Sequence, residues 1–122
     1  MMKSYVTRTT FTSTIFMGLE SSRHECRIFT KSEVVDYIRR VQDAYEFIVP
    51  LRYSETTFIS GEAYCESGLE ITAIDYPKLD ITPMQIRAFM SMLTEKLVDR
   101  FEQKTICMQE NGNTRMVRSK HD

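Results

Sequence analysis

The chain has 122 residues, with 16 Lys and Arg against 17 Asp and Glu and a formal net charge of −1. Its 42% hydrophobic and 27% charged residues exclude a largely disordered chain, and its length suffices for one domain with a single core. The near-neutral balance gives it no general attraction for DNA, RNA or an anionic membrane, so any anion site must be local. The chain has no apolar run of membrane-spanning length and no signal-peptide core in its polar first 20 residues, which favours a cytoplasmic protein.

The cysteines and histidines are sparse. Cys26, Cys65 and Cys107 are odd in number and far apart, which fits reduced thiols better than a disulfide framework. His24-Glu25-Cys26 is one metal-capable group, but no second pair lies at a ligand spacing. We therefore expect neither a metal nor a cofactor.

The N-terminal third predicts a strand and then a helix. Ser4 to Met17 is rich in Thr, Phe, Ile and Val and lacks Pro and Gly, which favours a long strand. Thr30-Lys31-Ser32-Glu33 has the form of a capping box, so a helix should run from Lys31 to about Tyr45. Apolar residues at spacings of four, three and four give it one stripe facing a sheet: Val34, Ile38, Val41 and Tyr45.

Three strands are expected between the helices. Glu46 to Tyr53 is one, with Pro50 placing it at an edge or interrupting it. Thr56 to Cys65 and Leu69 to Tyr76 flank Glu66-Ser67-Gly68, a short turn that suits a hairpin. The acidic residues here could form a general acid and base pair, but we interpret them as solvent-facing strand and turn residues: Glu62, Glu66, Glu70 and Asp75.

The second helix begins at another capping box, Thr82-Pro83-Met84-Gln85, and should run from Pro83 to about Glu102. Its apolar arc is wider than one sheet face needs, which predicts self-association through this helix. The arc consists of Ile86, Phe89, Met90, Met92, Leu93 and Leu97.

Asn111-Gly112 predicts a hairpin between Thr105 to Gln109 and Thr114 to Arg118. Residues 1–118 then form a single α+β domain, and residues 119–122 a frayed tail. The order β-α-β-β-β-α-β-β gives two helices packed on one face of a mainly antiparallel sheet.

No catalytic constellation is visible in the sequence. Walker-type and dinucleotide-binding glycine patterns are absent, so we expect no phosphate cradle built from glycines. Because no activated nucleophile or placed base is evident, we expect a protein that is not an enzyme. A guanidinium can bind a phosphate through two hydrogen bonds, and a neighbouring aromatic ring can stack on a base. The candidate cations are scattered: Arg8, Arg23, Arg27, Lys96, Arg100, Lys104, Arg115 and Arg118.

Several short segments together resemble the first family of phage Thoeris anti-defence proteins. They are Thr7 to Thr12, Gly18-Leu19-Glu20, Ile28-Phe29-Thr30, Phe101-Glu102-Gln103-Lys104 and Thr114-Arg115-Met116. The similarity touches both ends of the chain and leaves residues 46–81 almost uncovered.

This resemblance implies a protein that sequesters cyclic ADP-ribose isomers, made by bacterial TIR-domain immune enzymes, without cleaving them. It implies homodimers or dimer-based hexamers in the host cell cytoplasm, with pockets between subunits and a separate site for cyclic oligonucleotides in larger assemblies. The residues carried over are Arg8, Arg27 and Arg115 as phosphate-binding cations and Phe89 as a base-stacking ring.

Two other classes of function stay open at this point. One is a small phage-encoded inhibitor that binds a host protein directly through its sheet edge or a helix. The other is a small enzyme acting on a nucleotide. The sequence leaves the cyclic nucleotide isomer and the oligomer number undetermined.

Overall fold

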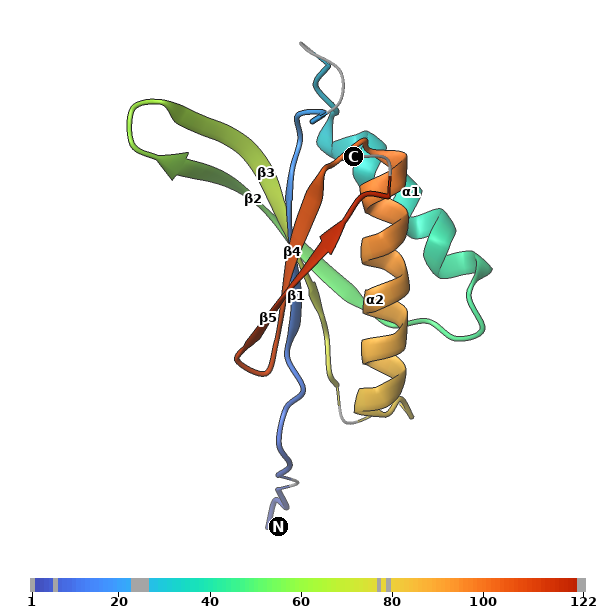
Figure 1. The fold of residues 1–122 in the computed structure, drawn as a ribbon. Helices are drawn as coiled ribbons and strands as arrows, with labels where there is room; N and C mark the ends of the chain where they lie inside the picture. Colours follow the sequence, from blue (N-terminus) through green and yellow to red (C-terminus); the bar gives the residue numbers. More distant parts are fainter. Residues whose placement is uncertain (1, 6, 23–26, 77, 79, 121–122) are drawn as a thin grey trace.

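The computed structural model describes residues 2–5, 7–22, 27–76, 78 and 80–120. Within these residues, five strands form one antiparallel sheet in the order β2-β3-β1-β4-β5, and both helices lie on one side of it (Figure 1). The elements are β1 Ser13–Gly18, α1 Lys31–Ala44, β2 Leu51–Ser60, β3 Tyr64–Ala73, α2 Pro83–Arg100, β4 Thr105–Glu110 and β5 Asn113–Arg118. The predicted α+β class is confirmed.

The core lies between the helices and one face of the sheet. Alternate residues of the central strands β1 and β3 point to this side and are almost fully buried, as Ile15 and Ile71 show. The predicted α1 stripe is buried against them at Val34, Ile38 and Val41. Burial of these apolar side chains is the main force that holds the helices on the sheet.

Both predicted capping boxes are present. The amide of Glu33 donates to the Thr30 hydroxyl at 3.1 Å, and the amide of Gln85 donates to the Thr82 hydroxyl at 3.2 Å. In each box the N3 side chain accepts from the backbone of the cap residue. The helices end at Ala44 and Arg100, slightly before the predicted ends.

The first strand is shorter than predicted. It begins at Ser13, and the described residues before it form no strand. Their amides bond to side chains, since Phe11 donates to the carboxylate of Asp75 at 2.7 Å and Thr12 to the side chain of Asn111 at 2.8 Å. A β-prone composition therefore does not make a strand where no neighbouring strand supplies a ladder.

The hairpin between the helices also differs from the prediction. Segments 46–53 and 56–65, expected as two strands, contribute to one strand, β2, which starts just after Pro50. The turn lies at residues 61–63, where Gly61 has a φ of +66°, and Glu66-Ser67-Gly68 is inside β3. Figure 1 shows the far end of this β2–β3 hairpin projecting away from the body of the molecule.

The C-terminal hairpin follows the prediction. Asn111 and Gly112 have φ values of 43° and 85°, and positive φ at both turn residues is what a type I′ turn requires. Beyond β5, the amide of Ser119 donates to the carbonyl of Lys104 at 2.8 Å, so the first residue of the expected tail is hydrogen-bonded.

The apolar arc of α2 does not leave the exposed excess from which self-association was predicted. Five of its six residues are buried within the chain, and Met92 is half-buried beside α1. The arc looks too wide for one sheet face because α2 packs against both the sheet and α1. Within the described residues, no helix combines the length and apolar composition that a membrane span requires.

Candidate functional site

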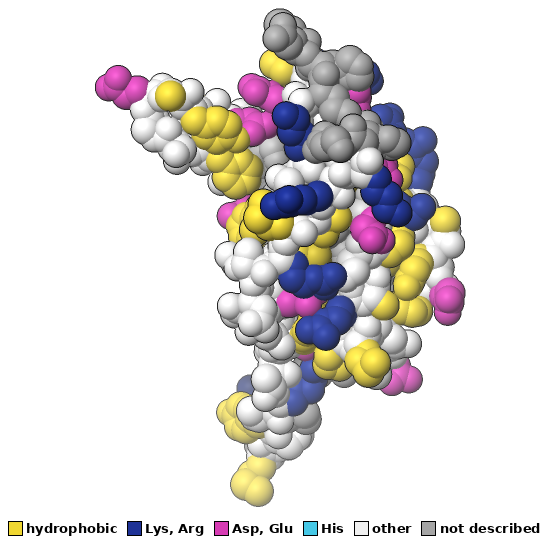
Figure 2. All heavy atoms as spheres, in the orientation of Figure 1, with side chains coloured by type: hydrophobic (Ala, Val, Ile, Leu, Met, Phe, Trp, Pro, Cys, Tyr) yellow, Lys and Arg dark blue, Asp and Glu magenta, His cyan; other side chains and the backbone are white. Residues whose placement is uncertain are grey.

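The sheet face opposite the helices carries a cluster of polar and aromatic side chains along the projecting hairpin. Figure 2 shows hydrophobic side chains on this hairpin. No described helix covers this face (Figure 1). The pairing register places Phe58 of β2 directly opposite Glu66 of β3, and Gly18 of β1 opposite Gly68 of β3. We call the cluster the open-face site: Gly18, Phe58, Tyr64, Glu66 and Gly68.

The two glycines make room for the other members of the open-face site. A Cβ atom at Gly18 would lie 2.2 Å from an oxygen of the Glu66 carboxylate. A Cβ atom at Gly68 would lie 2.2 Å from the Phe58 ring and 2.6 Å from the carbonyl oxygen of Met17. Glycine inside a strand is unfavourable and often marks a close approach of another group. Here it lets a carboxylate and an aromatic ring lie close against the sheet.

The Glu66 carboxylate is held by two donors. The amide of Glu20 donates to one oxygen at 3.0 Å, and the Tyr64 hydroxyl donates to the other. This hydrogen bond to Glu66 is the main reason that the pKa of Tyr64 is raised to about 12, with smaller contributions from burial and nearby negative charge. Tyr64 therefore stays protonated further into the alkaline range than an ordinary tyrosine does, and its hydroxyl keeps the carboxylate oriented.

The sequence interpretation missed the open-face site. It treated Glu66 as a solvent-facing residue of a turn, whereas Glu66 is half-buried inside β3 and hydrogen-bonded on both oxygens. A signal was present in Gly18 and Gly68, which both stand in strand-like surroundings. Their meaning depends on the register that brings them together.

Asp75, another acidic residue treated as solvent-facing, belongs to a structural clamp. Both of its oxygens accept from the guanidinium of Arg8, at 2.9 and 2.6 Å, and one also accepts from the amide of Phe11. The hydrogen bonds from Arg8 are the largest cause that lowers the pKa of Asp75. The clamp ties the N-terminal segment to the end of β3.

The four residues expected to bind a ligand have different partners, and the described contacts do not join them into one pocket. Arg8 is paired with Asp75, Arg27 with Glu102 at 3.0 Å, and Arg115 with Glu110 at 3.3 Å. Phe89 is fully buried and packs edge-to-face on Tyr45. Because both faces of its ring lie in the core, Phe89 cannot stack on a base without repacking that core. Phosphate binding by the three arginines stays a prediction.

The metal-capable segment cannot be assessed from the structure. Arg23, His24, Glu25 and Cys26 lie outside the described residues, as does His121. Among the residues that are described, no group of three or more His, Cys, Asp or Glu side chains is arranged to hold a metal ion.

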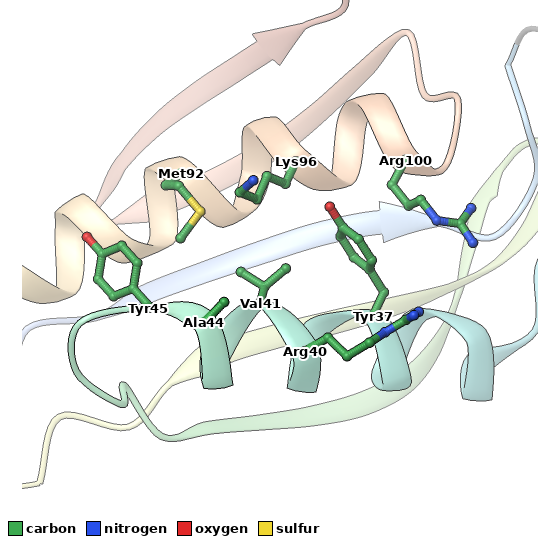
Figure 3. A pocket seen from close by; sticks show the side chains of 8 residues that line it. All are labelled: Tyr37, Arg40, Val41, Ala44, Tyr45, Met92, Lys96 and Arg100. Carbon is green, nitrogen blue, oxygen red and sulfur yellow. The ribbon is translucent and has the colours of Figure 1, made fainter.

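A second concave feature lies on the other side of the molecule, between the two helices. This inter-helix groove has a volume of about 530 Å³ (Figure 3). It is lined by two tyrosines, Tyr37 and Tyr45, and by three cations. Its cations are Arg40 of α1 and Lys96 and Arg100 of α2. The chain thus presents a carboxylate on the open face of the sheet and a basic groove among the helices.

Comparison with known proteins gives a match in fold. No protein-family model and no curated protein sequence matches the chain. A solved phage SAM (S-adenosylmethionine) lyase in complex with S-methyl-5′-thioadenosine superposes with a TM-score of 0.68 at 17% identity, covering 98% of this chain and 99% of the other. A phage SAM lyase in the apo state gives a TM-score of 0.66 at 18% identity, with the same coverage. This chain therefore has the fold of a small phage lyase.

This finding corrects one expectation and leaves another open. The chain was expected not to be an enzyme, but its fold is shared over nearly the whole length with proteins that are enzymes. The phage origin of these neighbours is consistent with the phage anti-defence proteins that the sequence resembles. It does not single out the Thoeris anti-defence family.

Proposed function

We propose that the chain is a lyase that binds S-adenosylmethionine at the open-face site and releases S-methyl-5′-thioadenosine. The observation that carries this proposal is the fold shared over nearly the full length with a phage SAM lyase bound to that thioether. The arrangement of Glu66, Tyr64 and Phe58 supports placing the substrate at the open-face site, because it joins a fixed carboxylate with an aromatic ring.

Charge favours the open face over the inter-helix groove. S-adenosylmethionine carries a sulfonium, an ammonium and one carboxylate, so its net charge is positive. The open face offers the fixed Glu66 carboxylate and, further along the same face of β3, Glu70. The cation of β2 on this face, Arg52, pairs with Thr72 and lies farther along the strands from Glu66 than Glu70 does. The groove offers Arg40, Lys96 and Arg100, which would repel such a cation.

Each member of the open-face site has a role in this proposal. The half-buried Phe58 ring, which lies across Gly68, offers its exposed side to an adenine ring. The Glu66 carboxylate accepts hydrogen bonds from the substrate ammonium, and Tyr64 and the Glu20 amide hold it in place. These residues bind and orient the substrate.

The reaction needs no activated protein nucleophile. The bond between the sulfonium sulfur and the γ-carbon of the methionine part breaks, and its electron pair stays on sulfur, giving the neutral thioether. The carboxylate of the same substrate closes on that carbon to form a lactone, which keeps the ammonium charge, so atoms and charge balance without water. An intramolecular displacement of this kind is accelerated by holding the chain in a reactive conformation. It therefore agrees with a sequence that shows no catalytic constellation.

The test is to incubate the purified protein with S-adenosylmethionine and follow substrate and thioether by mass spectrometry. We expect many equivalents of S-methyl-5′-thioadenosine per chain. The Glu66→Gln variant should lose most of this activity, whereas Glu62→Gln should retain it, because Glu62 is an exposed residue of the hairpin turn. Intact substrate after long incubation would contradict the proposal.

Cyclic ADP-ribose stays as a second candidate ligand, from the resemblance to Thoeris anti-defence proteins. It shares adenosine with S-adenosylmethionine but carries two phosphates, so it needs cations. The three cations of the inter-helix groove favour this possibility, and titration with the 1″–2′ and 1″–3′ isomers tests it directly. No heat change with either isomer at millimolar concentration would remove it.

A further inference from the structure

We infer that the inter-helix groove is a binding site for a nucleotide, with the phosphates held by Arg40 and Arg100. The groove is separate from the open-face site, because it lies between α1 and α2, on the other side of the sheet. Its volume of about 530 Å³ falls within the range of about 300–1,000 Å³ typical of small-molecule sites.

Within the part of the chain that the structure describes, the cations of the groove have no carboxylate partner. None of the ion pairs among the described residues involves Arg40, Lys96 or Arg100. Both helices carry acidic residues, but none of them lines the groove: Glu33, Asp36, Asp43, Glu95 and Asp99. Three like charges around one concavity repel one another, and a bound anion would relieve that repulsion.

One of these cations is held in position by aromatic rings. The guanidinium of Arg100 lies 5.8 Å from the ring centre of Tyr37 and 5.0 Å from that of Phe101. A cation in the last turn of α2 also interacts favourably with the helix dipole, which is one reason for an arginine at position 100. It does not explain why Arg40 and Lys96 line the same groove from two helices.

The groove has two chemically different ends. Figure 3 shows Arg40, Tyr37 and Arg100 toward one end, Tyr45 and Met92 toward the other, and Lys96 between them. Guanidinium groups bind phosphate oxygens through paired hydrogen bonds, and a planar base packs well on a tyrosine ring or a thioether. A molecule with a base at one end and phosphates at the other matches this arrangement better than a simple anion does.

Calorimetric titration of the full chain with ADP tests this inference. We expect one ADP per chain, with binding that weakens as salt is added. The double variant Arg40→Gln/Arg100→Gln should weaken binding by about 10- to 100-fold, since a hydrogen bond to a charged group contributes about a factor of ten. Both side chains project from helix surfaces, and an unchanged melting temperature would show that the variant is folded.

Arg39→Gln is the control for the loss of a cation from α1, because it removes one positive charge from the position next to Arg40. Arg39 lies beside a different hollow, between α1 and the sheet, and its variant should bind ADP like the wild type. Equal weakening by Arg39→Gln and by the double variant would overturn the inference, as would wild-type binding by the double variant. Absence of any binding at millimolar ADP would overturn it as well.

Three further ligands distinguish a nucleotide site in the groove from a simple anion site and from binding on the open face. Adenosine and inorganic pyrophosphate should each bind more weakly than ADP, and pyrophosphate binding as tightly as ADP would contradict a nucleotide site. Excess S-methyl-5′-thioadenosine should not displace ADP if the groove and the open-face site are distinct. Displacement together with weaker ADP binding in Phe58→Ala, which removes the ring proposed to stack on adenine, would place ADP on the open face and overturn the inference.

Discussion

Replacing Gly18 by Ala is the sharpest perturbation of the open-face site that the chain offers. The new Cβ atom would lie 2.2 Å from a carboxylate oxygen of Glu66, whereas ordinary contact begins at 3.4 Å, so the carboxylate must withdraw by about 1 Å. That movement breaks the hydrogen bond from the Glu20 amide, which now measures 3.0 Å. Gly18 does not have a positive φ, so the backbone itself accepts alanine.

The stability effect of Gly18→Ala should be small and the effect on activity large. A lost hydrogen bond to a charged group costs about 1.5–3 kcal/mol at most, and water can replace part of it at this half-exposed position. Alanine in a strand recovers about 0.5–1 kcal/mol relative to glycine. The net loss in unfolding free energy should therefore be about 1 kcal/mol. Misplacement of a positioning group by about 1 Å should lower kcat/KM for S-adenosylmethionine about 100-fold.

The assay combines urea unfolding with the rate of S-methyl-5′-thioadenosine release. Gly112→Ala is the control for stability, because Gly112 has a φ of +85° with no atom near a new Cβ, so it should lose stability without losing activity. Wild-type activity in Gly18→Ala would refute the reasoning that the position of Glu66 matters. Equal losses of activity in both variants would show that stability alone is responsible.

Three other predictions concern the charged groups. Between pH 10 and about 12 the unfolded chain loses the Tyr64 proton before the folded chain does, so the unfolding free energy should fall with rising pH in that window, and Glu66→Gln should flatten this slope. Because the pKa of Asp75 is lowered in the folded state, its stabilising contribution is present above about pH 4 and is lost in acid. Thermal melts should therefore show a deficit in Asp75→Asn at pH 7 that shrinks below pH 4, and a constant deficit would exclude the carboxylate charge as its cause. Glu110→Ala should cost about 2 kcal/mol in urea unfolding, because this buried carboxylate is bonded to two arginines, and a cost below about 0.5 kcal/mol would show that the network is unimportant.

The parts of the fold that depend on local signals could be predicted from the sequence. The capping boxes at Thr30 and Thr82 fixed where the helices begin, because the residues that form each box lie within one helical turn. Asn111-Gly112 located the last hairpin for the same reason, since both positive φ values belong to adjacent residues.

The hairpin between the helices depends on information that is not local. Gly61 and Gly68 are both plausible turn residues, and only pairing with β1 shows that Gly68 lies inside a strand opposite Gly18. The open-face site was missed for the same reason, since Gly18 and the Glu20 amide, which surround Glu66, come from a distant part of the chain. The ion pair of Arg8 could not be foreseen from the sequence, because its carboxylate partner Asp75 comes from a distant part of the chain.

The most direct test of the central claim is to locate the thioether on the protein. Amide chemical-shift mapping with S-methyl-5′-thioadenosine uses the Glu20 amide as a reporter, because that amide donates to Glu66. The account predicts that shift changes centre on Gly18, Glu20, Phe58 and Gly68. The amides of the groove residues Tyr37, Arg40, Tyr45 and Lys96 should stay unshifted. Shift changes confined to the groove, with none on the open face of the sheet, would contradict it.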